Sequence, residues 1–251
     1  MISRCSADEK SRFQSDQLFS ETSYNDGIIK QEVLTMKNNI TELVFILDRS
    51  GSMSGLESDT IGGFNSMIER QKKVDGTCYV TTVLFDTRID RIHDRVDLEQ
   101  IRPMTERDYQ PGGCTALLDA MGNTIDHIVH IHKYARPEDV PEFTTFVIMT
   151  DGLENASHYY SSDEVKQKVE HEKEKYGWEF LFLAANIDAV ETAGRIGIRP
   201  DRAVDYMADS EGTELAFHSL ADTVCAQRMG APIQADWSRK ISKDHKQRSK
   251  R

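Results

Sequence analysis

At 251 residues, the chain is long enough for one sizeable α/β domain with about forty residues left for tails, so no second hydrophobic core is required. Charged residues make up 29% and hydrophobic residues 38%, which is ordinary for a globular protein, and no apolar run approaches the ~18 residues of a membrane span. The net charge of −11 is uneven, because residues 237–251 carry +6 and the remainder −17, and an acidic body argues against nucleic acid as the main ligand.

Both ends of the chain are predicted to lie outside the folded domain. Residues 1–38 are polar, show no sustained period and are expected to be disordered, and residues 231–251 are expected to form a basic, mobile tail after a domain over 39–230. A translation start at Met36 would leave this domain whole, and that alternative start is a hypothesis that intact mass would test. The start of the sequence lacks the apolar core of a secretory signal, which predicts a cytoplasmic location.

The most informative stretch follows these first residues. A run of large apolar residues from Leu43 to Leu47 predicts a strand buried on both faces in the middle of a parallel sheet. The strand ends on Asp48, and Ser50 and Ser52 follow in a tight turn that Gly51 is expected to permit. Ligands of open α/β sheets bind at the carboxyl ends of strands. Three hard oxygen donors there, without sulfur or imidazole, favour Mg²⁺, Mn²⁺ or Ca²⁺ over zinc or copper.

The rest of the chain alternates between strand and helix patterns. In the first half, the sequence predicts a helix over 56–73, a strand over 78–85, an antiparallel edge strand over 88–93 and a helix over 116–133. In the second half, it predicts a strand over 143–149, a helix over 161–176, a strand over 178–184, a short helix from Asp188, a weak strand over 203–206 and a helix ending by Gly230. This alternation predicts a doubly wound, Rossmann-like α/β fold, with a mainly parallel sheet, one antiparallel edge strand and helices on both faces.

Two later residues would bring further oxygens to the same edge of the sheet. Thr115 lies in a glycine-rich loop that opens a helix, where unpaired backbone amides would favour an anionic ligand. Asp151 directly follows the strand over 143–149 and Thr150. The loop over 153–160 brings aromatic side chains to the same side, where they could touch a ligand or merely cover the end of the sheet.

Other reactive side chains are better explained as ordinary surface or loop residues. His127, His130 and His132 share a helix, but they lie far from Thr115 and no carboxylate partner is evident in the sequence. The four cysteines form no C-x-x-C pair, so neither a zinc site nor a disulfide framework is indicated. Cys114 lies beside Thr115, but no base is near it in the sequence.

The D-x-S-x-S pattern, with a separate threonine and a separate aspartate, resembles the metal-ion-dependent adhesion site (MIDAS) of von Willebrand factor type A (VWA) domains. All five positions are occupied, by Asp48, Ser50, Ser52, Thr115 and Asp151. The resemblance covers residues 40–230 and is to the intracellular bacterial type. It implies that the three hydroxyls bind Mg²⁺, or Mn²⁺ or Ca²⁺, directly or nearly so, while the two aspartates often act through water.

The same resemblance implies a protein partner. Its members leave the sixth coordination position of the metal for an Asp or Glu carboxylate of the partner, and intracellular bacterial members are frequently partners of ATPases or of stress-response and kinase-linked systems. A site with only two carboxylates retains little net negative charge and can accept one more anion. We therefore expect a protein-binding adaptor without enzyme activity, and with neither nucleic acid nor a membrane as partner.

Enzyme alternatives lack parts of their machinery. No G-x-G-x-x-G or P-loop follows any predicted strand, and Met53 occupies the serine position of a G-x-S-x-G nucleophile elbow. A Mg²⁺-dependent phosphatase of the haloacid dehalogenase type is the main rival, because it also ends its first strand on an aspartate. That type resembles D-x-D, whereas Ser50 stands where the second aspartate would act as general acid.

Overall fold

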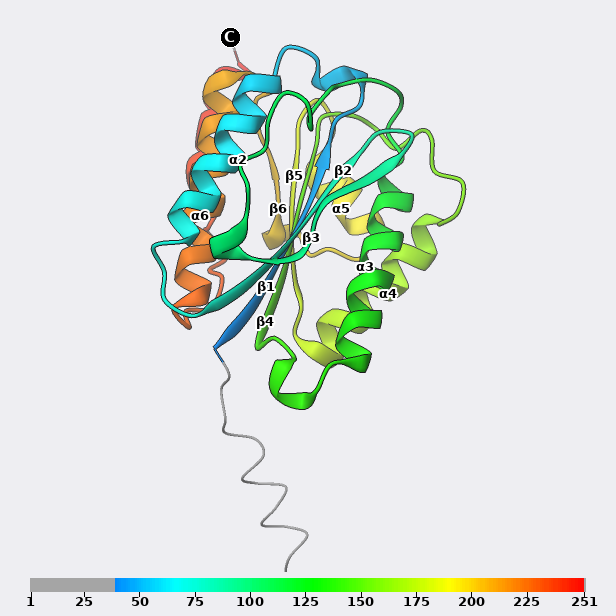
Figure 1. Cartoon of the computed structure of the whole chain (residues 1–251). Coiled ribbons are helices and arrows are strands. Elements are labelled where there is room, and N and C mark those ends of the chain that lie inside the picture. Colours follow the sequence, from blue (N-terminus) through cyan, green and yellow to red (C-terminus); the bar gives the residue numbers. More distant parts are fainter. Residues whose placement is uncertain (1–38, 251) are drawn as a thin grey trace, which may run out of the picture. The chain divides into compact units, whose positions relative to one another are not determined.

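The computed structural model describes residues 39–250, which contain a six-stranded sheet with helices on both faces (Figure 1). The strands are β1 Ile40–Asp48, β2 Thr77–Phe85, β3 Ile89–Asp97, β4 Phe143–Thr150, β5 Glu179–Ala184 and β6 Ala203–Asp205, in the spatial order β3-β2-β1-β4-β5-β6. All neighbours run parallel except β2 and β3, so the predicted α/β fold with one antiparallel edge strand is confirmed. The predicted disorder of residues 1–38 and the alternative start at Met36 lie outside the described residues.

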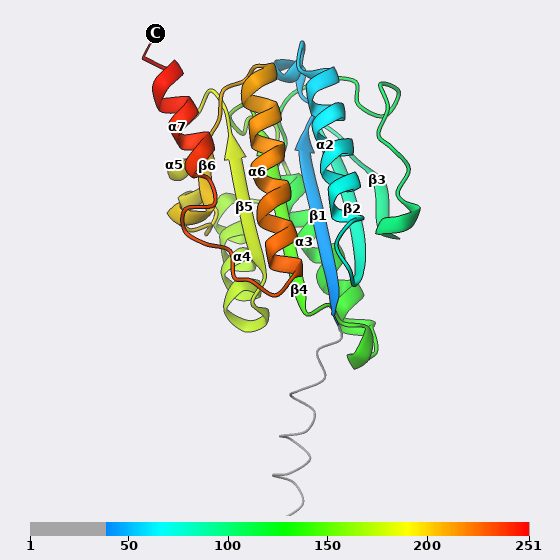
Figure 2. The same ribbon diagram turned by 90° about the vertical axis from the view of Figure 1, so that its left-hand side faces the viewer.

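Six α-helices accompany the strands in this part of the chain. They are α2 Glu57–Gln71, α3 Leu117–Tyr134, α4 Ser162–Tyr176, α5 Ala189–Arg195, α6 Ser210–Arg228 and α7 Arg239–Arg248. Helices α2 and α6 lie side by side on one face of the sheet, and α3 and α4 lie on the other (Figures 1 and 2). Within residues 39–250, no helix combines the length and the apolar character needed to cross a membrane.

Strand β1 lies in the middle of the sheet, and its apolar residues from Leu43 to Leu47 are all buried. Leu43, Phe45 and Leu47 belong to the hydrophobic cluster beneath α2 and α6, whereas Val44 and Ile46 belong to the cluster beneath α3, α4 and α5. Successive residues of a strand point to opposite faces, so an unbroken apolar run suits a strand covered by helices on both sides. This packing fixes the position of the strand's carboxyl end, where the candidate site begins.

The edge strand β3 confirms the antiparallel pairing expected after β2. Its register with β2 shifts between Val80 and Val83, which marks a bulge. The strand carries charged residues along the exposed edge, including Asp90, Arg91 and Asp94. Bulges and charges of this kind discourage pairing with the edges of other chains.

Helix α4 has well-defined capping residues at both ends. Ser161 and Glu164 form a reciprocal capping box, in which the Ser161 hydroxyl accepts from the Glu164 amide and the Glu164 carboxylate accepts from the Ser161 amide. Gly177 ends the helix in the left-handed region at a φ of 66°. The helix therefore begins one residue after Ser161, which is its N-cap, and not at residue 161 as predicted.

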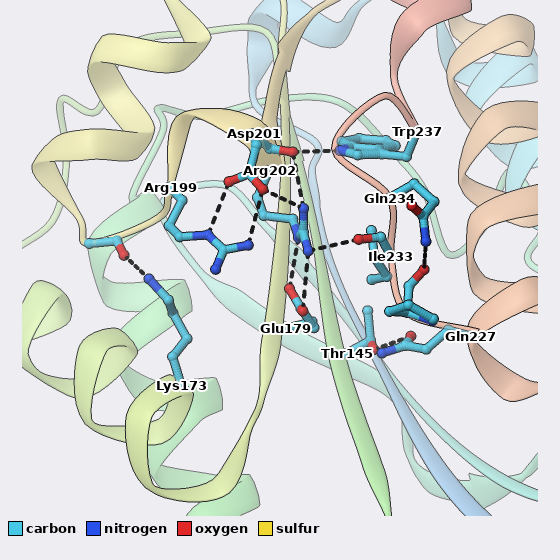
Figure 3. A network of polar contacts seen from close by, with 12 residues as sticks. Thr145, Lys173, Glu179, Arg199, Asp201, Arg202, Gln227, Ile233, Gln234 and Trp237 are labelled. Carbon is cyan, nitrogen blue, oxygen red and sulfur yellow. Dashed lines mark hydrogen bonds and ion pairs between the residues drawn. The ribbon is translucent and has the colours of Figure 1, made fainter. Parts of the chain in front are cut away.

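The expectation of a mobile C-terminal tail is wrong, because the segment after α6 docks on the domain. Ile241 of α7 is only 1% exposed, and Ile233 is also buried. Figure 3 shows how the connecting segment is held: the guanidinium of Arg202 donates to the carbonyl of Ile233 at 3.0 Å and to Glu179 at 2.8 Å, and the Trp237 indole donates to the carbonyl of Asp201 at 2.9 Å. A single buried isoleucine in a basic helix gives no apolar period, so the sequence pattern could not reveal this contact.

Candidate metal site

The residues predicted to bind a metal lie at the carboxyl edge of the sheet. β1 and β4 are neighbours, with Leu47 opposite Met149, so Asp48 and Asp151 occupy the ends of adjacent strands. The chain leaves β1 toward β2 on one side, while β4 pairs with β1 on the other. This edge is therefore the topological switch point at which open α/β sheets bind their ligands.

Asp48 is buried at the end of β1 and is held by hydrogen bonds to both carboxylate oxygens. Oδ1 accepts from the Ser50 amide at 2.7 Å, and Oδ2 accepts from the Thr150 hydroxyl at 2.6 Å. The hydroxyl of buried Tyr109 donates to the backbone carbonyl of Asp48. Each carboxylate oxygen of Asp48 has a further lone pair, so the hydrogen bonds fix its orientation and still leave it able to accept another contact.

The turn after β1 aligns two hydroxyls with the second carboxylate. Residues Gly51–Met53 form one 3₁₀ turn, which begins directly after Ser50. Ser50 Oγ lies 3.0 Å from Ser52 Oγ, and the Ser52 hydroxyl donates to Asp151 Oδ1 at 2.5 Å. Three of the five predicted ligands are thus joined in one continuous chain of oxygens.

Glycine is required in the neighbouring loop rather than in the turn itself. Gly51 is absent from the left-handed region, so the expected role of Gly51 in the bend is wrong, whereas Gly113 has a φ of 71°. A Cβ on Gly113 would lie 2.9 Å from Thr87 Oγ1. The Gly51 amide donates to the Gly113 carbonyl at 3.2 Å, which brings the loop that carries Thr115 against the turn.

Thr115 is buried and fixed by the loop after β4. Its amide donates to Asn155 Oδ1 at 3.0 Å, and its carbonyl accepts from the amides of Asn155 and Ala156 at 3.0 and 3.2 Å. A Cβ added to Gly152 would lie 3.2 Å from Thr115 Oγ1 and 3.4 Å from Ser52 Oγ. The bare backbone at Gly152 therefore leaves room for two hydroxyls that approach the same place from different loops.

The amides at the start of α3 are not free for an outside anion, contrary to the prediction. The Leu118 amide donates to Glu154 Oε2 at 2.9 Å, and the Asp119 amide donates to Ser157 Oγ at 3.0 Å. The chain thus supplies its own carboxylate to the positive end of the helix dipole. The anion preference expected near Thr115 is satisfied internally by Glu154.

Two carboxylates that sequence reasoning missed shape the loop beside Asp151. Glu154 Oε1 accepts from the amides of Ala156 and Ser157 at 2.9 and 2.7 Å. Asp119 accepts from three successive amides, those of residues 158, 159 and 160, at 2.8 to 2.9 Å. Hydrogen bonds from amides to a carboxylate are stronger than neutral ones, so the loop is held in one shape.

This loop presents two large apolar side chains to solvent. Tyr159 is 84% exposed and Leu153 is 63% exposed. Tyr160 points back instead: its ring lies against the position where a Cβ of Gly122 would stand, and its hydroxyl donates to Asp126 at 2.8 Å. Of the two tyrosines in the loop, only Tyr159 remains open to contact from outside.

A buried ion pair ties the loops together beneath the site. Arg49 Nε donates to Asp86 Oδ2 at 3.0 Å, with both side chains less than a tenth exposed, and Arg49 also contacts Asp90. The Gly112 amide donates to the Arg49 carbonyl at 2.9 Å, and the Ala116 amide donates to the Asp86 carbonyl at 3.1 Å. Removal of one partner would leave an uncompensated buried charge, so the pair fixes this geometry more than it adds stability.

The surroundings of Asp48 and Asp151 disfavour the charged form of both carboxyl groups. Burial raises the pKa of Asp48, and hydrogen bonds from Thr150 and Ser50 lower it only in part. Burial also raises the pKa of Asp151; the Ser52 hydroxyl opposes that shift, and the negative charge of Asp48 adds to it. A cation between the carboxylates would relieve both the desolvation and the repulsion.

The donor set fits a hard divalent cation. Ligands of Mg²⁺ lie at about 2.1 Å in octahedral geometry, so neighbouring ligand oxygens are about 3.0 Å apart. The two serine hydroxyls have that spacing, at 3.0 Å. Two carboxylates and three hydroxyls, without sulfur or imidazole, suit a hard divalent cation better than zinc or copper.

Other metal-type side chains in the described residues have structural partners. His127 Nε2 lies 2.7 Å from Asp94 Oδ1, and His132 Nε2 lies 3.1 Å from Glu42 Oε2, so the carboxylate partners not evident in the sequence do exist. The His130 ring packs on Tyr134 at 4.8 Å between centroids. Within residues 39–250, no group of three or more His, Cys, Asp or Glu side chains is placed to hold a metal. The candidate site therefore depends on its hydroxyls.

Comparisons with known proteins find likeness at the level of structure. No family model matches the sequence, and no curated protein matches it. A solved von Willebrand factor type A protein from Catenulispora acidiphila is similar with a TM-score of 0.50 and 10% identity, over 74% of this chain and 43% of that chain. Proximal thread matrix protein 1 of the mussel byssus is similar with a TM-score of 0.49 and 13% identity, over 74% and 46% of the two chains.

A further structure of that mussel protein, with a TM-score of 0.49, has a zinc-occupied MIDAS motif, which is a property of the mussel protein. The present chain spans less than half the length of the solved chains it matches. At such identities the likeness speaks for the fold alone. The strand order, the single antiparallel edge strand and this likeness together show that the chain has the fold of a VWA domain.

Proposed function

We propose that this chain is a protein-binding module that depends on a divalent metal held by Asp48, Ser50, Ser52, Thr115 and Asp151. The metal would be Mg²⁺, Mn²⁺ or Ca²⁺, and it would capture an Asp or Glu side chain of a partner protein. The observation that carries this proposal is the continuous chain of oxygens from Ser50 through Ser52 to Asp151 at the switch point of the sheet. With two carboxylates, the occupied site would stay open to one more anion.

The chain's own residues have distinct tasks in this proposal. The hydroxyls of Ser50, Ser52 and Thr115 would hold the ion, and the carboxylates of Asp48 and Asp151 would hold the water around it. Burial keeps bulk water away from Asp48, and its two hydrogen bonds fix its orientation before any ion arrives. A preformed site loses little conformational entropy when it binds.

Binding is favoured over catalysis because the site lacks a group that could move protons. Among the hydrogen bonds of residues 39–250, none joins a histidine or lysine side chain to any of the five residues. The phosphatase alternative gains no support, since Ser50 stands where that chemistry needs a second aspartate. We therefore propose a function without turnover.

The exposed loop beside the site supports an interface with a protein. Leu153 and Tyr159 are open to solvent close in sequence to Asp151, on a loop that takes its shape from hydrogen bonds to the buried carboxylate of Asp119. Rigid exposed aromatic and aliphatic side chains next to a strong polar contact are typical of interface hot spots. An acidic residue flanked by apolar side chains would suit this surface. An ATPase or a kinase-linked stress-response component is the class of partner that the sequence resemblance suggests.

Capture of partners from a lysate with the immobilised full chain tests the proposal. We expect one or more proteins to be retained with Mg²⁺ and released by EDTA, and to be lost with Ser50→Ala or Thr115→Ala. Thr77→Ala, an exposed position at the other end of β2, is the matched control and should retain them. Equal binding in EDTA contradicts the proposal, as does Mg²⁺-dependent phosphomonoester hydrolysis that Asp48→Asn destroys.

A further inference from the structure

One face of α7 carries a row of cationic side chains without acidic partners. Arg239, Lys243, Lys246 and Lys250 recur at intervals of four, three and four residues. The first three lie on one stripe of α7, and Lys250 follows two residues after the end of the helix. All four are exposed. Within residues 39–250, none of them makes an ion pair, and we call this set the basic stripe.

The opposite side of α7 is the one that docks on the domain. Ile241 is buried there, and Arg248 pairs with Asp209 at 2.7 Å, with Glu211 at 2.9 Å and with Asp244 at 3.1 Å. Asp244 is the one acidic residue of the helix, and it is used on this inner side. The basic stripe is therefore turned away from the body and is not required for packing.

The stripe works against the stability of its own helix. Like charges three or four residues apart on a helix repel, and α7 contains two such neighbouring pairs of the stripe, Arg239 with Lys243 and Lys243 with Lys246. Arg239 and Lys240 place positive charge in the first turn, at the positive end of the helix dipole, and the N-cap Ser238 makes no side-chain hydrogen bond. An anionic partner would remove this repulsion. Features that break local rules without a structural gain are expected at functional sites.

We propose that the basic stripe binds an acidic segment of a partner protein. Along the helix axis, the part of the stripe from Arg239 to Lys246 spans about 10 Å, at 1.5 Å per residue. A helical segment with carboxylates at matching intervals would face all four cations. Ser242 and Gln247 lie between the cations and line the same open hollow, where they can add hydrogen bonds. The residues that line this hollow come from α7 and from Lys250 just after it, so it is an accessible face and not an enclosed cavity.

The chemistry of the surface favours a protein over the other polyanions. A membrane-bound helix needs an exposed apolar side, whereas Ile241 is buried in the domain. A single-stranded nucleic acid needs aromatic side chains for base stacking, and the stripe has none. The body of the chain is acidic, so a long polyanion would be repelled beyond the stripe, while a short acidic segment would not. Salt should weaken the contact, because exposed charges are screened.

Fluorescence anisotropy with the full chain tests this proposal in EDTA, so that the candidate metal site cannot contribute. The probe is a labelled helical peptide with glutamates at intervals of four, three and four residues, and its reference has glutamines at those positions. We expect the glutamate peptide to bind and the reference not to bind. Lys243→Gln/Lys246→Gln should weaken binding at least tenfold, whereas Lys73→Gln/Lys133→Gln, with the same change in net charge, should stay within about threefold.

The same titration includes single-stranded RNA and vesicles containing phosphatidylserine as competing probes. A melting temperature within about two degrees of the wild type establishes that the Lys243→Gln/Lys246→Gln chain is folded. Absence of peptide binding, equal binding by the two double variants, or tighter binding of RNA or vesicles than of the peptide would each overturn the proposal. None of these outcomes depends on whether the metal site captures a partner.

Discussion

The hydroxyl of Thr150 donates a 2.6 Å hydrogen bond to Asp48 Oδ2, and this bond joins the last residue of β4 to the last residue of β1. Both side chains are buried. The bond therefore transmits the register of two central strands to the orientation of the first site carboxylate. Thr150 touches the proposed metal only through Asp48, which makes it a positioning residue.

Replacement of Thr150 by valine should weaken metal binding without abolishing it. The shape of the side chain is kept, but Asp48 Oδ2 loses its donor while it stays buried, at a cost of about 1–3 kcal/mol. We expect lower stability and weaker metal binding in Thr150→Val. Thr144→Val changes a buried threonine of the same strand that makes no hydrogen bond to the site, and it should leave metal affinity unchanged. Equal metal affinity in both variants would contradict the role of Thr150.

Without metal, the charge on Asp48 should destabilise the fold near neutral pH. The pKa of Asp48 is raised by burial, so the folded state holds the proton more tightly than the unfolded chain, whose carboxyl pKa is about 3.9. Stability in EDTA should thus rise as pH falls through the raised pKa and level off below about pH 4. Asp48→Asn removes the charge and should therefore remove this part of the pH dependence of stability.

Denaturant unfolding of the wild type and Asp48→Asn between pH 5 and pH 7.5 measures this difference. In EDTA the variant should be at least as stable as the wild type at pH 7.5, and the gap should close at lower pH. In excess Mg²⁺ the order should reverse, because only the wild type gains binding free energy. A wild type that is more stable than Asp48→Asn in EDTA at pH 7.5 would show that the desolvation argument is wrong.

The loop beside Asp151 should depend on the carboxylate of Asp119. In Asp119→Ala, three amides lose their acceptor, and we expect faster hydrogen exchange at residues 158–160 together with a stability loss of about 1–3 kcal/mol. Asp126→Ala, on the same helix, removes contacts to side chains only and is the control. Unchanged exchange at these three amides in Asp119→Ala would mean that the loop holds its shape by other means.

Removal of residues 231–251 should lower the stability of the domain. The segment buries Ile233 and Ile241, and Ile241→Ala alone is expected to cost about 2–5 kcal/mol. Lys243→Ala, at an exposed position of α7, should cost little. Denaturant midpoints decide the matter, and an unchanged midpoint after truncation would show that α7 contributes nothing to the fold.

The sequence predicted those features that depend on residues close together in the chain. The apolar run from Leu43 to Leu47 carries its own periodicity, so a strand buried on both faces could be predicted and is confirmed. Asp48, Ser50 and Ser52 lie within five residues after that strand, which made their convergence predictable. The edge strand after residue 86 was also recognisable, from its turn and its charges.

The supporting residues could not be found in this way, because their partners are distant in sequence. Thr150 lies 102 positions from Asp48, and Asn155 lies 40 positions from Thr115. Their hydrogen bonds depend on the register of β1 against β4, which no local pattern encodes. A threonine at the end of a strand next to an aspartate is the one signal that could have pointed to Thr150.

The docking of α7 was missed for a different reason. Ile241 is one apolar residue among cations, so composition alone favoured a mobile tail. The segment that leads into α7 is held by hydrogen bonds to backbone carbonyls, from the Arg202 guanidinium to Ile233 and from the Trp237 indole to Asp201. Backbone acceptors carry no sequence signature, and such contacts appear only in the structure.

The most direct test of the account is isothermal titration of Mg²⁺ and Mn²⁺ into the metal-free full chain. We predict one ion per chain for the wild type and for Asp75→Asn, which changes an exposed carboxylate outside the site, and no binding for Asp48→Asn, with the fold kept in all three. A wild type that takes up neither ion at millimolar concentration, or an Asp48→Asn chain that binds as tightly as the wild type, would contradict the proposed site.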